Sequence, residues 1–222
     1  TGRENRRSPV TKNEYCRDLI EHAVKNQIPF KYVLFDVWYA SAENMRFIKQ
    51  EMKRDFVCPI KTNRKVTLSV SEQHHGHYQR VETLELGENT VREIYLEGVD
   101  FPLLLAKQAF VNEDGSIGIL YLVSSDTTLS YDGITSNYQK RWAVEYYHKS
   151  LKQNVSLEKS PAKTVTTQTN HFFAALWGFV KLELLKAGTM LNHFALKTKL
   201  YLHALHSAFF TLQQLKPVQV TA

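Results

Sequence analysis

The sequence has little cysteine and no long apolar run, and these shortages exclude several classes of protein. Cys16 and Cys58 are the only cysteines, too few for a disulfide framework and without the spacing of a zinc site. The most apolar region, residues 171–185, is interrupted by Lys181 and Glu183, so it falls short of the roughly 18 apolar residues of a membrane span. No secretory signal peptide is visible either. We therefore expect a soluble protein of a reducing cytosol, with no membrane association.

The composition allows a packed core and favours acidic partners. Hydrophobic residues make up 43% of the 222 residues, and the formal net charge is +6 with a pI of about 9.2. A basic protein attracts nucleic acid, although the same charge also serves solubility alone.

The stretch from Tyr138 to Lys152 predicts a single helix with an unusual polar stripe. The side chains that form the stripe are Tyr138, Arg141, Glu145 and Lys152. At about 100° per residue, these four lie within roughly 60° of one another on one helix. A carboxylate can bind a divalent metal, and the flanking cations and phenol can bind phosphate oxygens. The alternative is a solvated helix face, since Arg–Glu pairs at this spacing are common.

A second acidic position precedes the stripe. Residues 31–36 form a nearly continuous apolar run that predicts a central strand covered on both faces, with Asp36 at its carboxyl end. Ligands are usually bound at that end of a strand in α/β sheets. Ser41 then predicts the cap of a helix over residues 42–54, and Thr11 with Glu14 predicts the capping box of an earlier helix that ends near Gln27. For Asp36 alone, a cap or turn role is the alternative to a metal ligand.

The spacing of Tyr138, Arg141, Glu145 and Lys152 resembles the YREK motif of one large branch of bacterial insertion-sequence DDE transposases. Asp36, followed after Val37 by Trp-Tyr-Ala-Ser, resembles the second-aspartate motif of the same branch. The resemblance covers most of the chain.

The resemblance implies a mixed α/β, ribonuclease-H-like fold with a β-rich insertion and C-terminal helices. Residues 1–60 would form the first part of the core, with the second Asp motif. Residues 61–123 read as the mainly β insertion and a return strand, 124–165 as the YREK helix and a basic linker, and 166–222 as a helical segment. Short strands are expected over residues 64–70, 80–86 and 91–96, and residues 101–110 and 117–123 are expected to form a hairpin. Residues 124–128, which include Asp126, read as a loop, and the apolar and aromatic side chains of residues 172–180 are assigned to core or subunit packing. Within the insertion, His74, His75 and His77 are expected in a polar loop, because no further metal ligand lies at a zinc-like spacing. The histidines of the last helix, among them His193, are expected to be structural, without carboxylate partners.

The resemblance also implies an activity: cleavage and rejoining of transposon-end DNA by two-metal phosphodiester chemistry. Asp36 and Glu145 would be catalytic and would bind two Mg²⁺ ions, with Mn²⁺ as the alternative. The expected partners are double-stranded DNA, as transposon ends and target, and a second copy of the chain in a synaptic dimer. The location would be the bacterial cytoplasm, at the nucleoid. The residues expected to bind DNA are Tyr138, Arg141, Lys152, Lys149 and Trp142.

One element of the family pattern is not found. The first aspartate of the triad should lie on a strand before Asp36, but that segment reads as a loop and one helix, and Asp18 lies inside the helix. We therefore expect that the first aspartate and the early strands are missing, that the chain corresponds to the latter part of a longer transposase, and that it does not cleave DNA by itself. Some relatives in this branch cleave through a DNA hairpin with the help of an aromatic residue of the insertion. None of the three tryptophans of this chain lies there, so the sequence does not decide whether a hairpin forms. The alternatives are a non-catalytic DNA-binding remnant, another ribonuclease-H-like nuclease such as a resolvase, and a globular protein with no nucleic-acid role.

Overall fold

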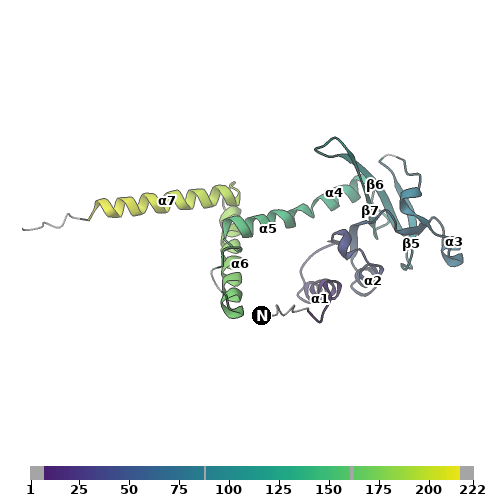
Figure 1. Ribbon diagram of the computed structural model, residues 1–222, viewed down its shortest axis with the longest axis horizontal. Coiled ribbons are helices and arrows are strands. Elements are labelled where there is room, and N and C mark those ends of the chain that lie inside the picture. Colours follow the sequence, from purple (N-terminus) through teal and green to yellow (C-terminus); the bar gives the residue numbers. More distant parts are fainter. Residues whose placement is uncertain (1–7, 88, 161–162, 216–222) are drawn as a thin grey trace, which may run out of the picture. The chain divides into compact units, whose positions relative to one another are not determined.

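The computed structural model describes residues 8–87, 89–160 and 163–215 (Figure 1). The chain divides into two compact units, Thr1–Arg141 and Trp142–Ala222. The first contains the sheet, and the second is helical.

The first unit is built on a sheet that has seven strands within the described residues, in the order β1-β2-β7-β6-β5-β3-β4. Strands β1 and β2 are parallel, and the other pairs are antiparallel. The strands are β1 (Tyr32–Leu34), β2 (Asp55–Ile60), β3 (Lys65–Thr67), β4 (Gln79–Arg80), β5 (Val91–Leu96), β6 (Leu103–Val111) and β7 (Ile117–Ser124).

Strand β1 lies at the edge of this sheet, so the expectation of a central strand is wrong for the described chain. It has three half-buried residues and pairs, among the described residues, with β2 alone. An apolar run shows that a strand is at least partly covered, but it does not show how many neighbours the strand has.

Helices cover both faces of the sheet, and the alternation of side chains along its strands explains this. On β2, Phe56, Cys58 and Ile60 point into one core, whereas Val57 points into another. The first core also contains Met45 and Ile48, which are fully buried. The elements on this side are α1 (Lys12–Lys25), the 3₁₀ turn η1 (Val37–Tyr39), α2 (Ala42–Arg46) and the π turn η2 (Phe47–Glu51).

The opposite face is covered by α4 (Tyr131–Gln139), whose Ile134 and Tyr138 pack on Val57 and Leu122. The expected caps of α1 and α2 are confirmed: Thr11 and Glu14 form a capping box, and the Ser41 hydroxyl accepts from the amide of Asn44.

The expected insertion is less β-rich than its sequence indicates. The hairpin of β6 and β7 is confirmed, but the strand expected after Arg80 is only β4 followed by the 3₁₀ turn η3 (Val81–Thr83). His74 and His75 lie in a short helix, α3 (Val70–His75), and not in a loop. Ser69 caps this helix and Gly76, with φ of 70°, ends it, so local hydrogen bonds outweigh the alternating pattern.

The second unit consists of α5 (Trp142–Asn154), α6 (Val165–Ala187) and α7 (His193–Gln213). Its buried centre is the His193 ring, which lies 5.1 Å from the Phe179 ring. His193 Nδ1 is 2.7 Å from the Ser150 hydroxyl, and Nε2 is 3.0 Å from a Glu183 oxygen. His193 is thus structural as expected, but the expectation that it lacks a carboxylate partner is wrong.

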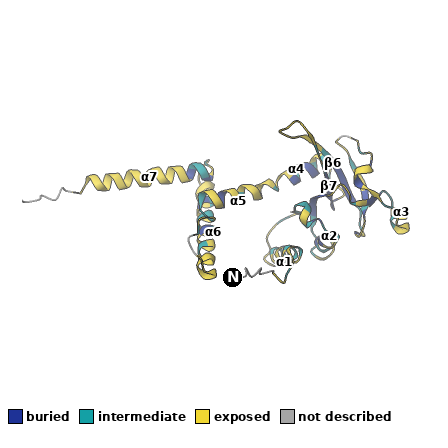
Figure 2. Ribbon diagram, viewed as in Figure 1, coloured by how far each residue is buried: buried dark blue, intermediate teal, exposed yellow. Residues whose placement is uncertain are grey.

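Much of α6 and α7 is exposed in the described chain (Figure 2). The aromatic face of α6, which the sequence assigns to packing, leaves Phe173 and Trp177 each 63% exposed. No helix in the described ranges has the length and apolar character that crossing a membrane requires.

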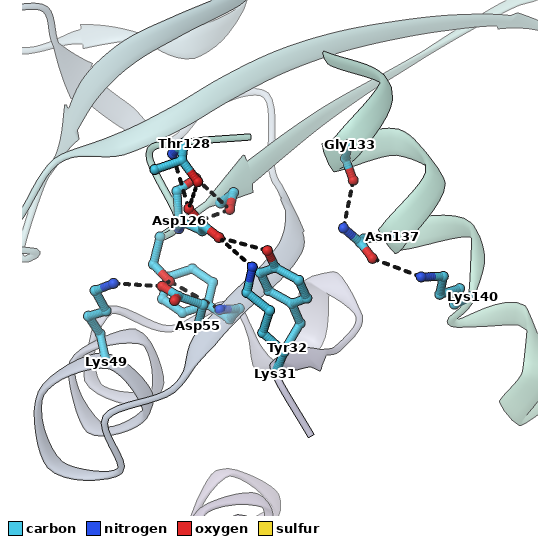
Figure 3. Close-up of polar contacts among 12 residues, drawn as sticks. Lys31, Tyr32, Lys49, Asp55, Asp126, Thr128, Gly133, Asn137 and Lys140 are labelled. Atoms are coloured by element: carbon cyan, nitrogen blue, oxygen red, sulfur yellow. Dashed lines mark hydrogen bonds and ion pairs between the residues drawn. The ribbon is translucent and has the colours of Figure 1, made fainter. Parts of the chain in front are cut away.

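The single helix predicted from Tyr138 to Lys152 is wrong. The chain forms α4 and α5, with a turn at Lys140 and Arg141 between them. The amides of these two residues bond to carbonyls three residues back, as in a tightened last helical turn. Lys140 also donates to the Asn137 side chain, which donates to the Gly133 carbonyl (Figure 3). The lysine charge stabilises the carboxyl end of α4.

Candidate functional site

Asp36 lies where the sequence predicts it, just beyond the carboxyl end of β1. It is half-buried, and its Oδ1 accepts a 2.6 Å hydrogen bond from the Val37 amide, so it caps η1. Among residues 8–87, 89–160 and 163–215, no cation forms an ion pair with its carboxylate. Asp36 thus has the cap role that the sequence left open as an alternative. Within the described residues, this hydrogen bond leaves the negative charge of the carboxylate without a cation beside it.

A buried amide joins the segment after Asp36 to α1. Asn44 is 1% exposed, and its side chain donates to Asn13 Oδ1 at 3.0 Å and to the Tyr39 carbonyl at 2.9 Å. Its own oxygen accepts from Arg17 at 2.9 Å. Because a buried polar group costs stability unless it is paired, this network fixes the start of α1 beside η1.

This arrangement encloses a hollow beside the carboxylate. The hollow has a volume of about 400 Å³. Its lining combines a carboxylate, a lysine, an amide and two aromatic rings: Lys12, Asn13, Asp36, Trp38 and Tyr39.

A second hollow also borders Trp38, and its lining contains cations instead of an acid. It measures about 200 Å³ and is lined by Trp38, Lys61 and Arg64, among others. Lys61 Nζ is 5.9 Å from the centre of the Trp38 ring, and that side chain is 79% exposed. The sequence analysis did not select these three residues. The available signal was a large aromatic residue two positions after a strand-end aspartate.

Tyr138 and Arg141 belong to the same unit as Asp36. Tyr138 is only 7% exposed, and Arg141 Cζ lies 5.5 Å from its ring. Burial raises the pKa of the Tyr138 phenol, Arg141 lowers it, and the negative charge of Asp36 raises it further. The structure therefore brings the phenol within electrostatic reach of Asp36, but it buries the ring in the core under α4.

The other residues of the predicted stripe lie on α5, in the second unit. Glu145, Lys149 and Lys152 are exposed, and their spacing of four and three residues places them on one face of this helix. Lys152 Nζ is 2.6 Å from Glu158, and this hydrogen bond raises the pKa of the lysine. Lys149 Nζ lies 5.6 Å from the Phe194 ring, and Trp142 is 62% exposed.

The donor set for a metal is incomplete within the described residues. Asp36 and Glu145 supply the hard carboxylate oxygens that Mg²⁺ prefers. In that part of the chain, however, no three Asp, Glu, His or Cys side chains are grouped so that they could hold a metal ion. Each of these two carboxylates fits a divalent cation by its chemistry, and one lies in each unit of the chain.

Two further aspartates lie at the opposite end of β1 and β2 (Figure 3). Asp126 accepts hydrogen bonds from Tyr32 at 2.7 Å and from the amide and hydroxyl of Thr128 at 3.0 and 2.6 Å. Its Oδ2 is also 3.3 Å from Lys31 Nζ. The hydrogen bond from the Thr128 hydroxyl contributes most to lowering the pKa of Asp126, and the other bonds add to it. Together they hold this pKa well below its usual value.

The Asp55 carboxylate also accepts hydrogen bonds from neighbouring side chains. Its Oδ1 accepts from Lys49 at 2.6 Å and from the Ser125 hydroxyl at 2.7 Å, and the same hydroxyl accepts from the Phe56 amide at 3.1 Å. Both acids at this end connect the starts of β1 and β2 to the end of β7. Their carboxylates are occupied by structural hydrogen bonds.

A comparison with protein families gives one match. A family model described as "Transposase DDE domain" matches residues 10–178, a range that includes both Asp36 and Glu145. A search of curated proteins found no match.

Proposed function

This chain belongs to the transposase DDE domain family, and from that membership we propose that it serves in cutting and rejoining the DNA ends of a transposon, as the part of the catalytic domain that carries the second and third acidic residues. The family uses divalent metal ions and acts on DNA. We propose Mg²⁺ as the ion, transposon ends and a target duplex as the substrates, and a dimer of the chain as the form that pairs two ends. The observation that carries the proposal is that the match spans both acidic motifs.

Asp36 and Glu145 are the proposed metal ligands. When bound, two divalent ions would activate the attacking oxygen and stabilise the leaving oxyanion of phosphodiester cleavage. The first unit's own contribution is to hold the hard oxygens of Asp36 just beyond the carboxyl end of β1. The Asp36 carboxylate suits this role because it is half-buried and has no ion pair within the described ranges.

The cations near these acids are proposed to bind the DNA backbone. Lys149 and Lys152 lie on the same helical face as Glu145, so they can contact phosphates next to the reacting one. Arg141, in the turn just before α5, and Trp142, the first residue of α5, would extend this contact. Because Tyr138 is buried, we assign it to positioning Arg141, whose guanidinium lies against its ring.

The metal assignment can be tested by counting bound Mn²⁺ with electron paramagnetic resonance. We expect weaker binding in Asp36→Asn and in Glu145→Gln, in the presence of random-sequence duplex DNA. If both residues bind the same ions, the double variant should lose little more than either single variant. Asp18→Asn is the matched control, because it removes the same charge from an exposed position of the same unit. Equal Mn²⁺ binding in all four variants and the wild type would exclude the assignment.

The DNA assignment can be tested by the salt dependence of binding to duplex DNA. A steep linear fall of log affinity with log salt is expected from phosphate contacts. Steep salt dependence without any Mn²⁺ binding would indicate the alternative, a DNA-binding remnant without chemistry. Cleavage without joining to a target would indicate a nuclease such as a resolvase.

A further inference from the structure

Trp38 is the most exposed part of the rim that carries Asp36. The 3₁₀ turn η1 presents its ring to solvent with 79% of the residue exposed, whereas the following Tyr39 is half-buried and Ala40 is buried. A large aromatic ring in water is costly unless a ligand covers part of it. The Asp36 side chain caps the turn that carries Trp38, so the carboxylate and the ring belong to the same short segment.

Trp38 borders two hollows that differ in the charges they contain. One hollow contains the Asp36 carboxylate with Lys12. The other contains Lys61 and Arg64. Neither Lys61 nor Arg64 takes part in an ion pair within the described residues, and Lys61 Nζ is 5.9 Å from the ring centre. An aromatic face with two uncompensated cations beside it matches the two parts of a nucleotide, a flat base and a phosphate.

We propose that Trp38 stacks on an unpaired base of the DNA strand that lies at Asp36, and that Lys61 and Arg64 bind the adjoining phosphate. This inference rests on the proposed function, and it adds a contact that the acidic motifs do not include. The base has to be unpaired because both faces of a base inside a duplex are already covered by its neighbours. Stacking on an aromatic side chain is insensitive to base identity, so the contact would recognise an opened strand and not a sequence.

The second unit supplies a matched control. Trp177 on α6 is 63% exposed, and Lys181 Nζ lies 5.0 Å from the centre of its ring. It is therefore also an exposed tryptophan with a lysine over its face, but it belongs to the unit that does not contain Asp36. A general effect of removing exposed tryptophan should appear equally at both positions.

The test compares two labelled DNAs of random sequence, a blunt duplex and the same duplex with a single-stranded 3′ extension. Fluorescence anisotropy would measure their affinity for the full chain in EDTA, so that cleavage does not interfere. We expect Trp38→Ala to weaken binding of the extended DNA by roughly tenfold and of the blunt duplex by less than about twofold. Trp38→Phe should retain most of the affinity, and Trp177→Ala should bind both DNAs like the wild type.

The two cations are tested by the salt slope. Lys61→Ala and Arg64→Ala should each reduce the slope of log affinity against log salt by about 1 or slightly less. Circular dichroism and thermal unfolding would confirm that each variant is folded, which is expected because Trp38 and Lys61 are exposed.

Several outcomes would overturn the inference. Wild-type affinity of Trp38→Ala for the extended DNA would do so, as would equal losses in Trp38→Ala and Trp177→Ala. A change in oligomeric state with unchanged DNA affinity would show that a second copy covers Trp38 instead. These results leave the proposed function standing. If the wild-type chain binds neither DNA in a salt-dependent way, the proposed function fails first and the inference fails with it.

Discussion

The two ends of strands β1 and β2 both carry aspartates, but the two sets of carboxylates are used differently. At one end Asp55 and Asp126 accept several side-chain hydrogen bonds each, from a lysine, hydroxyls and a phenol. At the other end Asp36 accepts from the amide of the next residue and lines an open hollow. An acid whose bonds are all made within the fold stabilises that fold, whereas an acid with spare oxygens can bind something else.

This difference predicts opposite effects of mutation on stability and on function. The largest effect on stability is expected at Asp126. In Asp126→Ala, the hydroxyl and amide of Thr128 and the phenol of Tyr32 lose their acceptor inside the protein. The free energy of unfolding should fall by about 3 kcal/mol, because three partly buried hydrogen bonds, each typically worth about 1 kcal/mol, would be lost. Urea unfolding of this variant and of Asp18→Ala, an exposed control, would measure it. A loss no larger than that of the control would show that these bonds do not stabilise the native state.

The same residue predicts how stability depends on acid. The pKa of Asp126 is lower in the folded chain than the ordinary value of about 3.9 in an unfolded one. Its contribution is therefore present above about pH 4 and is lost as the pH falls below that value. The stability of Asp126→Asn should fall less steeply between about pH 5 and pH 2 than that of the wild type. If urea unfolding shows that the stabilities of the variant and the wild type fall equally steeply below about pH 5, the pKa of Asp126 is not lowered in the folded chain.

A smaller loss is expected for Asp55→Asn. The amide keeps an acceptor for Ser125, but it no longer pairs with the charge of Lys49, which is partly exposed. The free energy of unfolding should fall by about 1 kcal/mol, which is the typical net contribution of one hydrogen bond. In the background Lys49→Met, which has no lysine charge, the same substitution should cost less. An unchanged cost there would assign the effect to Ser125 alone.

The smallest change in stability is expected at Asp36. Asparagine caps a helical turn about as well as aspartate, so Asp36→Asn should shift the free energy of unfolding by less than about 0.5 kcal/mol. Its metal binding should nevertheless be impaired, as proposed above. If Asp36→Asn destabilises the chain as much as Asp126→Ala, the contrast between the two ends disappears and Asp36 is a structural acid.

Local features of the fold were predictable from the sequence. The caps at Thr11 and Ser41, the hairpin of β6 and β7, and the position of Asp36 after a strand depend on neighbouring residues and were predicted correctly. The helix break at Lys140 was not predicted, because neither glycine nor proline marks it. The stripe therefore looked continuous, although its first two members and its last two lie in different units.

Features that depend on distant partners could not be predicted. Asp126 was read only as part of a loop, since nothing near it in sequence indicates that Tyr32 and Lys31 will meet it. The exposure of Trp38 and the pairing of its side chain with Lys61 likewise follow from how η1 and the end of β2 come together. The edge position of β1 is set by pairing, which hydrophobicity alone does not encode.

That edge position has a consequence for handling the protein. Among the described residues, β1 has a strand on one side only, so backbone groups of Tyr32–Leu34 on the other side are available to an incoming chain. Such an edge is a template for intermolecular sheet growth, and concentrated samples should self-associate there first. The brevity of β1 and the charge of Lys31 beside it both limit that growth, in the way that many β proteins guard their outermost strands.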